Sequence, residues 1–286
     1  MRSEFEKALR KLHRQGKKQF GDDWIARLQQ RRAKLEGSYA TLYEQNRDPI
    51  AYAPLSAQTA YVFAYAPTRA EYTRQYLLRH RMAMNAPIFT RDRVEVVSFG
   101  GGPASELVGL IRYLEDEAAG EPVTAIEYIV YDKDGDWDEV ATKIAAAINT
   151  EIEITTRYEA TDAASRTKMS AVDLSNTDLV ICSYIMSELA RLEVADRIAD
   201  NFRAALGRMK LGSKIVFIDN MHPIVIKYFQ SCKLVSGLTQ RNDDGDPIVC
   251  NFPKMTGTFE QLSQLLEWVP RTDLRSVSKL IVRTNM

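Results

Sequence analysis

The spacing of apolar residues changes near residue 93, and this change divides the chain into two kinds of structure. Up to residue 46, apolar residues recur every three or four positions, as on one face of a helix. They include Phe5, Leu9, Leu12, Trp24, Ile25, Leu28 and Leu35. The Gly21-Asp22-Asp23 stretch offers a break and an N-cap between two such helices. The first part of the chain is therefore predicted to be α-helical.

Aromatic residues gather between positions 50 and 86, where Pro54 and Pro67 interrupt the pattern. They are Tyr52, Tyr61, Phe63, Tyr65, Tyr72 and Tyr76. Because aromatic side chains bury large apolar areas, we expect them to pack between the N-terminal helices and the rest of the molecule. The alternative is that some of them line a ligand pocket.

From residue 93 onward, short apolar runs of strand length alternate with stretches of helical spacing. Strands are predicted at 94–99, 126–132, 152–156, 179–184, 214–220 and 279–285. Helices are predicted from the first strand to residue 117, and at 137–149, 192–209 and 258–268. Such alternation implies right-handed crossovers and a doubly wound sheet. We expect an α/β fold with a mostly parallel, Rossmann-like sheet and an α-helical N-terminal extension, divided into residues 1–90 and 91–286.

Composition is that of an ordinary folded protein, but charge is unevenly distributed. The 286 residues are 45% hydrophobic and 27% charged, and the formal net charge is zero. Residues 1–34 carry eleven Lys or Arg against four Asp or Glu, which is +7 and leaves −7 for the remainder. A basic arm can hold a polyanion such as RNA. The competing interpretation is a solvated helix face.

The pattern does not favour disulfide, metal or membrane chemistry. The cysteines are widely spaced and odd in number, at Cys182, Cys232 and Cys250. The histidines are too scattered to suggest a metal site, so none is expected. The first twenty residues lack the apolar segment of a secretory signal, and no apolar run reaches the roughly 18 residues of a membrane span. We expect a cytoplasmic protein in a soluble, reducing compartment.

The most informative segment is VEVVSFGGGPASELVGL (94–110), where an apolar strand runs directly into glycines and then into a helix. Glycines at such a turn let the backbone approach a ligand closely, and the helix N-terminus offers free N–H groups. Asp132 ends the second predicted strand, where a carboxylate can accept hydrogen bonds from ribose hydroxyls. Together these features predict a nucleotide-like ligand at the C-terminal edge of the sheet.

The order Gly-x-Gly-x-Ala at residues 100–104 resembles the first motif of class I S-adenosylmethionine (SAM)-dependent methyltransferases. The resemblance spans about residues 90–286. It implies that Gly100, Gly101, Gly102 and Pro103 lie against SAM and that Asp132 binds its ribose. By the same resemblance, Asp162 would hydrogen-bond the adenine amino group.

A further element of this resemblance is DLVICSYIMSEL (178–189), since in this superfamily the end of the fourth strand faces the methyl group and the acceptor. The resemblance implies that Ser183 contacts the cofactor and that Tyr184 and Glu188 are candidate catalytic residues. Tyr184 could stack on a planar acceptor, and Glu188 could orient or deprotonate a nucleophile. The motif Ser-Tyr-x-x-Ser-Glu-Leu (183–189) within it resembles methyltransferase-like proteins of the small mitochondrial ribosomal subunit. The SFGGGP loop resembles fungal large-subunit rRNA uridine methyltransferases.

The chain also departs from the family pattern in two places. Many members have an acid two residues before the first glycine, where this chain has Ser98, and Glu106 is a candidate substitute. The Asn/Asp-Pro-Pro-Tyr motif of amino-group methyltransferases is absent from the fourth strand. The second departure disfavours methylation of exocyclic base amines.

The combined expectation is an enzyme, a SAM-dependent methyltransferase, whose acceptor is RNA somewhat more than a small molecule. No membrane and no metal partner is expected. Two alternatives stay open: a non-catalytic SAM-fold protein that binds RNA or assists ribosome assembly, and an NAD-dependent oxidoreductase. The 30 residues from Gly102 to Asp132 exceed the roughly 20 expected of a dinucleotide site, which disfavours the oxidoreductase.

Overall fold

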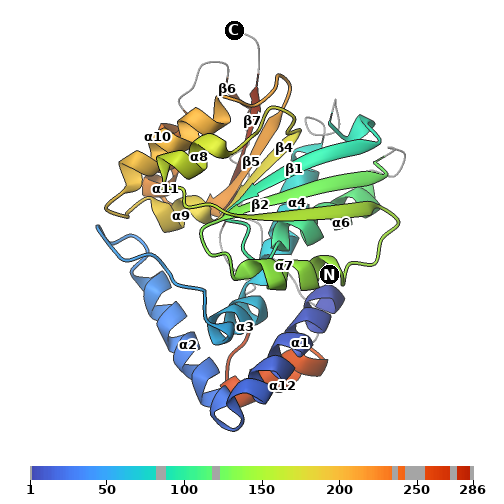
Figure 1. Cartoon of the computed structure of the whole chain (residues 1–286), viewed down its shortest axis with the longest axis vertical. Coiled ribbons are helices and arrows are strands. Elements are labelled where there is room, and N and C mark those ends of the chain that lie inside the picture. Colours follow the sequence, from blue (N-terminus) through green and yellow to red (C-terminus); the bar gives the residue numbers. More distant parts are fainter. Residues whose placement is uncertain are drawn as a thin grey trace.

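A computed structural model shows a sheet-centred body with a group of helices at one end (Figure 1). The structure describes residues 2–81, 88–117, 123–233, 238–241, 255–270 and 276–283. Cys250 lies outside these residues.

Within the described residues, seven strands form one sheet in the order β3-β2-β1-β4-β5-β7-β6. The strands are β1 (Arg93–Phe99), β2 (Ala125–Asp132), β3 (Glu153–Ala160), β4 (Leu179–Ser183), β5 (Lys214–Asn220), β6 (Leu238–Arg241) and β7 (Ser276–Arg283). The first five are parallel, whereas β7 runs antiparallel to both β5 and β6. The prediction of a mostly parallel, doubly wound sheet is confirmed. The short strand β6 was not predicted, and β3 continues four residues beyond its predicted end.

Helices cover both faces of the sheet. They are α1 (Arg2–Phe20), α2 (Asp23–Ala40), α3 (Leu55–Ala64), α4 (Ala66–Arg79), α6 (Ser105–Glu117), α7 (Trp137–Ala145), α8 (Arg166–Ala171), α9 (Ile185–Leu189), α10 (Ala195–Leu206), α11 (Pro223–Lys233) and α12 (Gly257–Leu266), with a short 3₁₀ turn, η1 (Ile88–Thr90). One core joins the sheet to α4 and α6, and a second joins its other face to α8, α9, α10 and α11.

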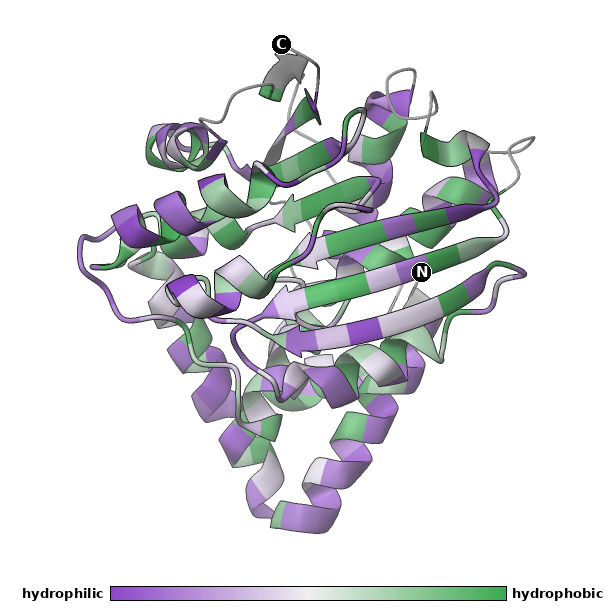
Figure 2. Ribbon diagram, turned by 45° about the horizontal axis from the view of Figure 1, so that its top comes forward, coloured by the Kyte–Doolittle hydropathy of each residue, from purple (hydrophilic) through white to green (hydrophobic). Residues whose placement is uncertain are grey.

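Burial explains the hydropathy of the strands. Every residue of β4 is buried, as are all but the last residue of β5, because both faces of these strands are covered. The edge strand β3 has only exposed and half-buried residues. Figure 2 shows the same contrast, with hydrophobic colour along the middle strands and hydrophilic colour on the outer surfaces of the helices.

The predicted N-terminal helices are confirmed, and they form a third core together with α12 from near the chain's other end. The Glu6 carboxylate of α1 accepts hydrogen bonds from the Thr258 and Phe259 amides at the start of α12. Arg32 of α2 donates to the Leu266 and Glu267 carbonyls at its end. A carboxylate at a helix start and a cation at its end both complement the helix dipole. These contacts fix α12 to α1 and α2.

Helix contacts cross the predicted division at residue 90 in both directions. Helix α4 lies before the division but packs on the sheet, whereas α12 lies after it and packs on α1 and α2 (Figure 1). The division into a helical N-terminal segment at residues 1–90, as a lid or substrate-binding part, and a SAM-binding domain at residues 91–286 stays a prediction.

Membrane helices and metal clusters are both absent among the described residues. None of their helices is long and apolar enough to cross a membrane. No group of three or more His, Cys, Asp or Glu side chains in this part of the chain is arranged to hold a metal ion. Cys182 and Cys232 are buried free thiols.

Gly109 permits the close contact between α6 and α4. A Cβ atom there would lie 2.3 Å from the Ala70 carbonyl oxygen, whereas a Cβ on Gly37 of α2 would meet nothing within 4 Å. Gly109→Ala is expected to lower the free energy of unfolding by about 1–3 kcal/mol, because α4 and α6 must move apart. Gly37→Ala, the matched control, is expected to be neutral or stabilising by up to about 1 kcal/mol. Urea denaturation measures both, and equal effects would contradict the close contact.

Candidate functional site

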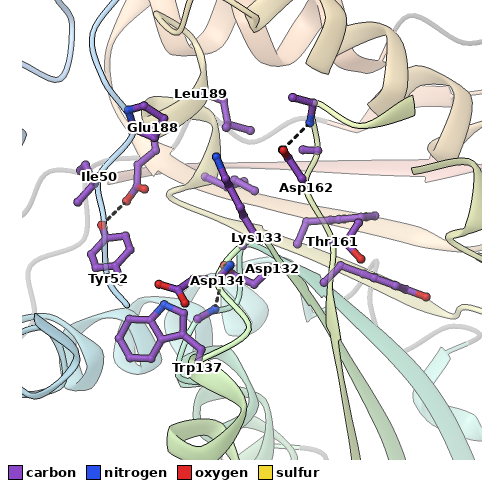
Figure 3. Close-up of a pocket in the computed structure, with 18 of the residues that line it drawn as sticks. Ile50, Tyr52, Asp132, Lys133, Asp134, Trp137, Thr161, Asp162, Glu188 and Leu189 are labelled. Carbon is purple, nitrogen blue, oxygen red and sulfur yellow. Dashed lines mark hydrogen bonds between the residues drawn. The ribbon is translucent and has the colours of Figure 1, made fainter. Parts of the chain in front are cut away.

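A cavity of about 600 Å³ lies at the C-terminal ends of the parallel strands. Its floor is formed by the turns that follow β1, β2, β3 and β4, and residues 49–53 and Tyr61 of the N-terminal part line its other side. This volume is within the range of small-molecule sites, roughly 300–1,000 Å³. Figure 3 shows the side chains around it.

The glycine turn after β1 adopts a conformation that favours glycine. Gly100 and Gly102 have φ values of +64° and +44°, in the left-handed region. Gly100, Gly102 and Pro103 line the cavity. Gly101 belongs to the same turn but does not line the cavity; a Cβ there would lie 2.7 Å from the Ser98 hydroxyl below it.

Asp132 ties the end of β2 to this turn. One carboxylate oxygen accepts a hydrogen bond from the Gly102 amide at 3.0 Å, and the other accepts one from the Asp134 amide at 3.0 Å. Burial raises the pKa of Asp132 to about 6, although these backbone donors lower it. Its side chain lines the cavity and leaves lone pairs for a ligand (Figure 3).

Asp162 lies two residues beyond β3, also on the cavity wall. Its side chain accepts a hydrogen bond from the Ala164 amide at 2.9 Å. The wall near it is apolar and includes Ala163, Met169, Leu192, Ile198 and Phe202. A carboxylate beside an apolar wall suits a flat heteroaromatic ring that carries an amino group.

Ser183 and Tyr184, at the end of β4, also line the cavity. Tyr184 has a φ of +56°, an uncommon conformation for a non-glycine residue that occurs preferentially at functional sites. The guanidinium of Arg69, from α4, lies 3.0 Å from the centroid of the Tyr184 ring. One face of this ring is therefore covered by the protein itself.

Glu188, in α9, is held by the segment that precedes α3. The Tyr52 hydroxyl donates to its carboxylate at 2.9 Å, and Tyr52 in turn contacts the Tyr39 hydroxyl at 2.8 Å (Figure 3). Arg47 donates to the Glu188 carbonyl. Burial raises the pKa of Glu188 to about 7, against the lowering effect of Tyr52, Arg47 and Arg69. A carboxyl group with this pKa changes its protonation near neutral pH.

Glu106 is buried at the start of α6 and does not line the cavity. Burial raises its pKa to about 7, while Ser183 and Arg69 lower it. Its role as a substitute for the acid that Ser98 replaces stays a prediction. The ring centroids of His222 and Tyr43 are 3.9 Å apart, and the two rings are stacked. Neither His222 nor Asn220 lines the cavity.

Sequence reasoning missed much of the wall opposite the strands. Residues 49–53 line the cavity, and Tyr52 and Tyr61 do so as the second interpretation of the aromatic cluster suggested. The other members, Phe63, Tyr65, Tyr72 and Tyr76, are buried in the core as the first suggested. Trp137, the first residue of α7, lines the cavity next to Gly102. Its position directly after the second strand was the available signal.

Comparison with known proteins indicates the family of this chain. A family model described as "Putative SAM-dependent methyltransferase" matches residues 18–194, which is more than half of the chain. No curated protein matches the sequence.

Solved structures with a similar fold include several methyltransferases. An O-methyltransferase family protein from Burkholderia thailandensis is 10% identical, covers 93% of this chain and 74% of its own, and has a TM-score of 0.48. A carbon methyltransferase, CurJ, is 12% identical, covers 96% and 71%, and has a TM-score of 0.48. A SAM-dependent methyltransferase from Archaeoglobus fulgidus is 14% identical, covers 74% and 94%, and has a TM-score of 0.40.

Proposed function

Because the chain belongs to this family of SAM-dependent methyltransferases, we propose that it transfers the methyl group of SAM to a planar N–H or O–H acceptor carried by RNA. The enzyme class and the cofactor follow from the family, which assigns SAM rather than NAD. The acceptor and the role of each residue are the proposal. The cavity at the strand ends, with Glu188 on its wall, is the observation that supports it.

The residues of the cavity suit the three parts of SAM. Asp162 and the apolar wall beside it would hold the adenine ring, and Asp132 would accept hydrogen bonds from the ribose hydroxyls. The backbone at Gly100 and Gly102 would face the methionine part, because no side chain blocks the approach. Ser183 would contact the same part from the end of β4.

Bound SAM supplies a methyl group on a positively charged sulfur; the acceptor forms a bond to this carbon while the carbon–sulfur bond breaks. The protein must hold the two reactants in line and remove the acceptor's proton. Glu188 is suited to take that proton, since its pKa of about 7 matches a general base at neutral pH. Tyr184, with one ring face covered by Arg69, would shape the wall against which the acceptor lies.

The N-terminal helices favour RNA as the carrier of the acceptor. Among the described residues, their exposed basic side chains are Lys7, Arg10, Lys11, Arg14, Lys17, Lys18, Arg27 and Lys34. Helix α2 leads into residues 41–54, and these reach the cavity wall. Lysine and arginine side chains in such numbers can contact successive phosphates. A free small molecule is the second candidate, because residues 49–53 cover one side of the cavity.

Methyl transfer from labelled SAM distinguishes the two acceptors. The substrates are total RNA from cells that lack this protein and, separately, the small-molecule extract of the same cells. Transfer to RNA is expected, and Arg10→Glu/Arg14→Glu is expected to reduce it at least tenfold at physiological salt. Arg197→Glu/Lys227→Glu, which changes two exposed basic residues of α10 and α11, is the control with the same charge change. Transfer confined to the small-molecule extract would contradict the RNA proposal.

Asp132→Ala is expected to weaken SAM binding by at least about tenfold, because the ribose hydroxyls lose a charged acceptor and the glycine turn loses the bond to Gly102. Calorimetric titration measures the dissociation constant. Asp138→Ala removes an exposed acid of the adjacent helix α7 that does not line the cavity, and it is expected to leave binding unchanged. Equal affinities in the two variants would contradict the assignment of Asp132.

Glu188→Gln is expected to lower kcat by about 10²–10⁴-fold while the affinity for SAM changes much less. The raised pKa sets the direction of the pH dependence. The carboxylate form, which accepts the proton, is lost as pH falls through about 7, so kcat of the unaltered protein should fall below that pH. In Glu188→Gln this decrease of kcat at low pH should be absent. If kcat of the variant still falls below a pH of about 7, the proton transfer belongs to another group.

A further inference from the structure

Three aromatic rings meet at one end of the cavity. The ring centroids of Tyr52 and Tyr61 are 5.3 Å apart, those of Tyr61 and Trp137 are 5.5 Å apart, and those of Tyr52 and Trp137 are 5.8 Å apart. The planes of the rings are inclined to one another by 48–76°. All three residues line the cavity, Tyr52 and Tyr61 half-buried and Trp137 buried against them, and we call this group the aromatic corner.

The aromatic corner joins elements that are distant in sequence. Tyr52 precedes α3, Tyr61 lies within α3, and Trp137 begins α7 after β2. Trp137 lies beside the glycine turn, since a Cβ on Gly102 would be 3.7 Å from its ring. Tyr52 is bonded to Glu188 on the other side (Figure 3). The corner therefore lies between the turn after β1 and the helix after β4.

Carboxyl groups surround this corner on the cavity side. Glu188, Asp132 and Asp134 all line the cavity there. Lys133, next to Asp132 in sequence, also lines the cavity and is outnumbered by these three carboxyl groups, whereas Arg69, which lies against the Tyr184 ring, does not line it (Figure 3). A set of ring faces next to carboxylates is an environment that attracts a positively charged group.

The order of the strands indicates which part of SAM reaches the corner. Asp162 follows β3, Asp132 follows β2, the glycine turn follows β1, and Ser183 ends β4. These strands are neighbours in that same order, about 4.8 Å apart at each step. With adenine at Asp162 and ribose at Asp132, the sulfur of this elongated molecule must lie toward β1 and β4. That is the side on which the aromatic corner lies.

We propose that Tyr52 and Tyr61, whose rings pack against Trp137, recognise the positive charge of the SAM sulfonium group by cation–π attraction, so that the protein binds SAM more tightly than its neutral product. The inference rests on the proposed SAM site and adds how the protein recognises the charge of the bound ligand. A sulfonium group, like a quaternary ammonium group, cannot donate hydrogen bonds, and ring faces are the surface that attracts such cations. After transfer the sulfur is neutral, so the attraction is lost and the product is released more readily.

Calorimetric titration with SAM, S-adenosylhomocysteine (SAH) and sinefungin tests this inference. Sinefungin carries a protonated amine in place of the sulfonium group. The unaltered protein is expected to bind SAM and sinefungin about tenfold more tightly than neutral SAH. Tyr61→Leu and, independently, Tyr52→Leu are expected to reduce this preference about three- to tenfold and to change SAH affinity by less than about twofold.

Tyr61→Phe is the matched control, because it keeps the ring and removes only the hydroxyl. It should retain the preference for the charged ligands. Thermal unfolding of each variant shows whether the fold is intact, and Tyr52, outside any helix or strand, gives a second variant if Tyr61→Leu does not fold. Equal weakening of all three ligands in both leucine variants would overturn the inference and leave the SAM site standing. Failure of the unaltered protein to bind any of them would instead contradict the proposed function.

Discussion

A parallel sheet buries both of its faces, and in this chain one of the covers comes from the N-terminal part. Helix α4 packs against α6 and the sheet, and Gly109 lets their backbones approach closely. With α4 fixed there, α3 and the segment before it lie across the C-terminal ends of the strands. The same packing requirement therefore builds the hydrophobic core and closes one side of the cavity. The N-terminal part is a wall of the site and not an appendage.

Closing the cavity removes water from its charged groups. Asp132 and Glu188 on its wall are half-buried, and Asp219, which does not line it, is buried; loss of hydration raises the pKa values of these acids to about 6 or 7. Arg69, also buried, lowers the pKa values of Glu188 and Asp219. Such a group of desolvated charges gives little stability, because their loss of hydration offsets their attraction. Two acids with raised pKa values, Asp132 and Glu188, on the wall of one cavity are typical of a functional site.

Local sequence patterns predicted the strands and the strand-end site residues because each of these depends on neighbouring positions. The run Arg93–Phe99 reads as a buried strand from its own residues, and Gly100 and Gly102 follow it directly. Asp132, Asp162 and Ser183 could be placed in the same way, since C-terminal strand ends meet at one edge. Strand β6 was not predicted from the sequence. It has only four residues and lies at the edge of the sheet, where it pairs only with β7.

What the sequence determined by itself was the order of strands and helices, the glycine turn and the cofactor class, all carried by short and contiguous patterns. Only the tertiary structure decided that Tyr52 and Tyr61 meet Trp137, that Tyr52 holds Glu188, and that α12 joins α1 and α2. The reason is physical: these contacts join residues 76–252 positions apart in the chain. Contacts of such separation depend on how whole helices pack, and hydrophobic periodicity gives the face of a helix but not its partner.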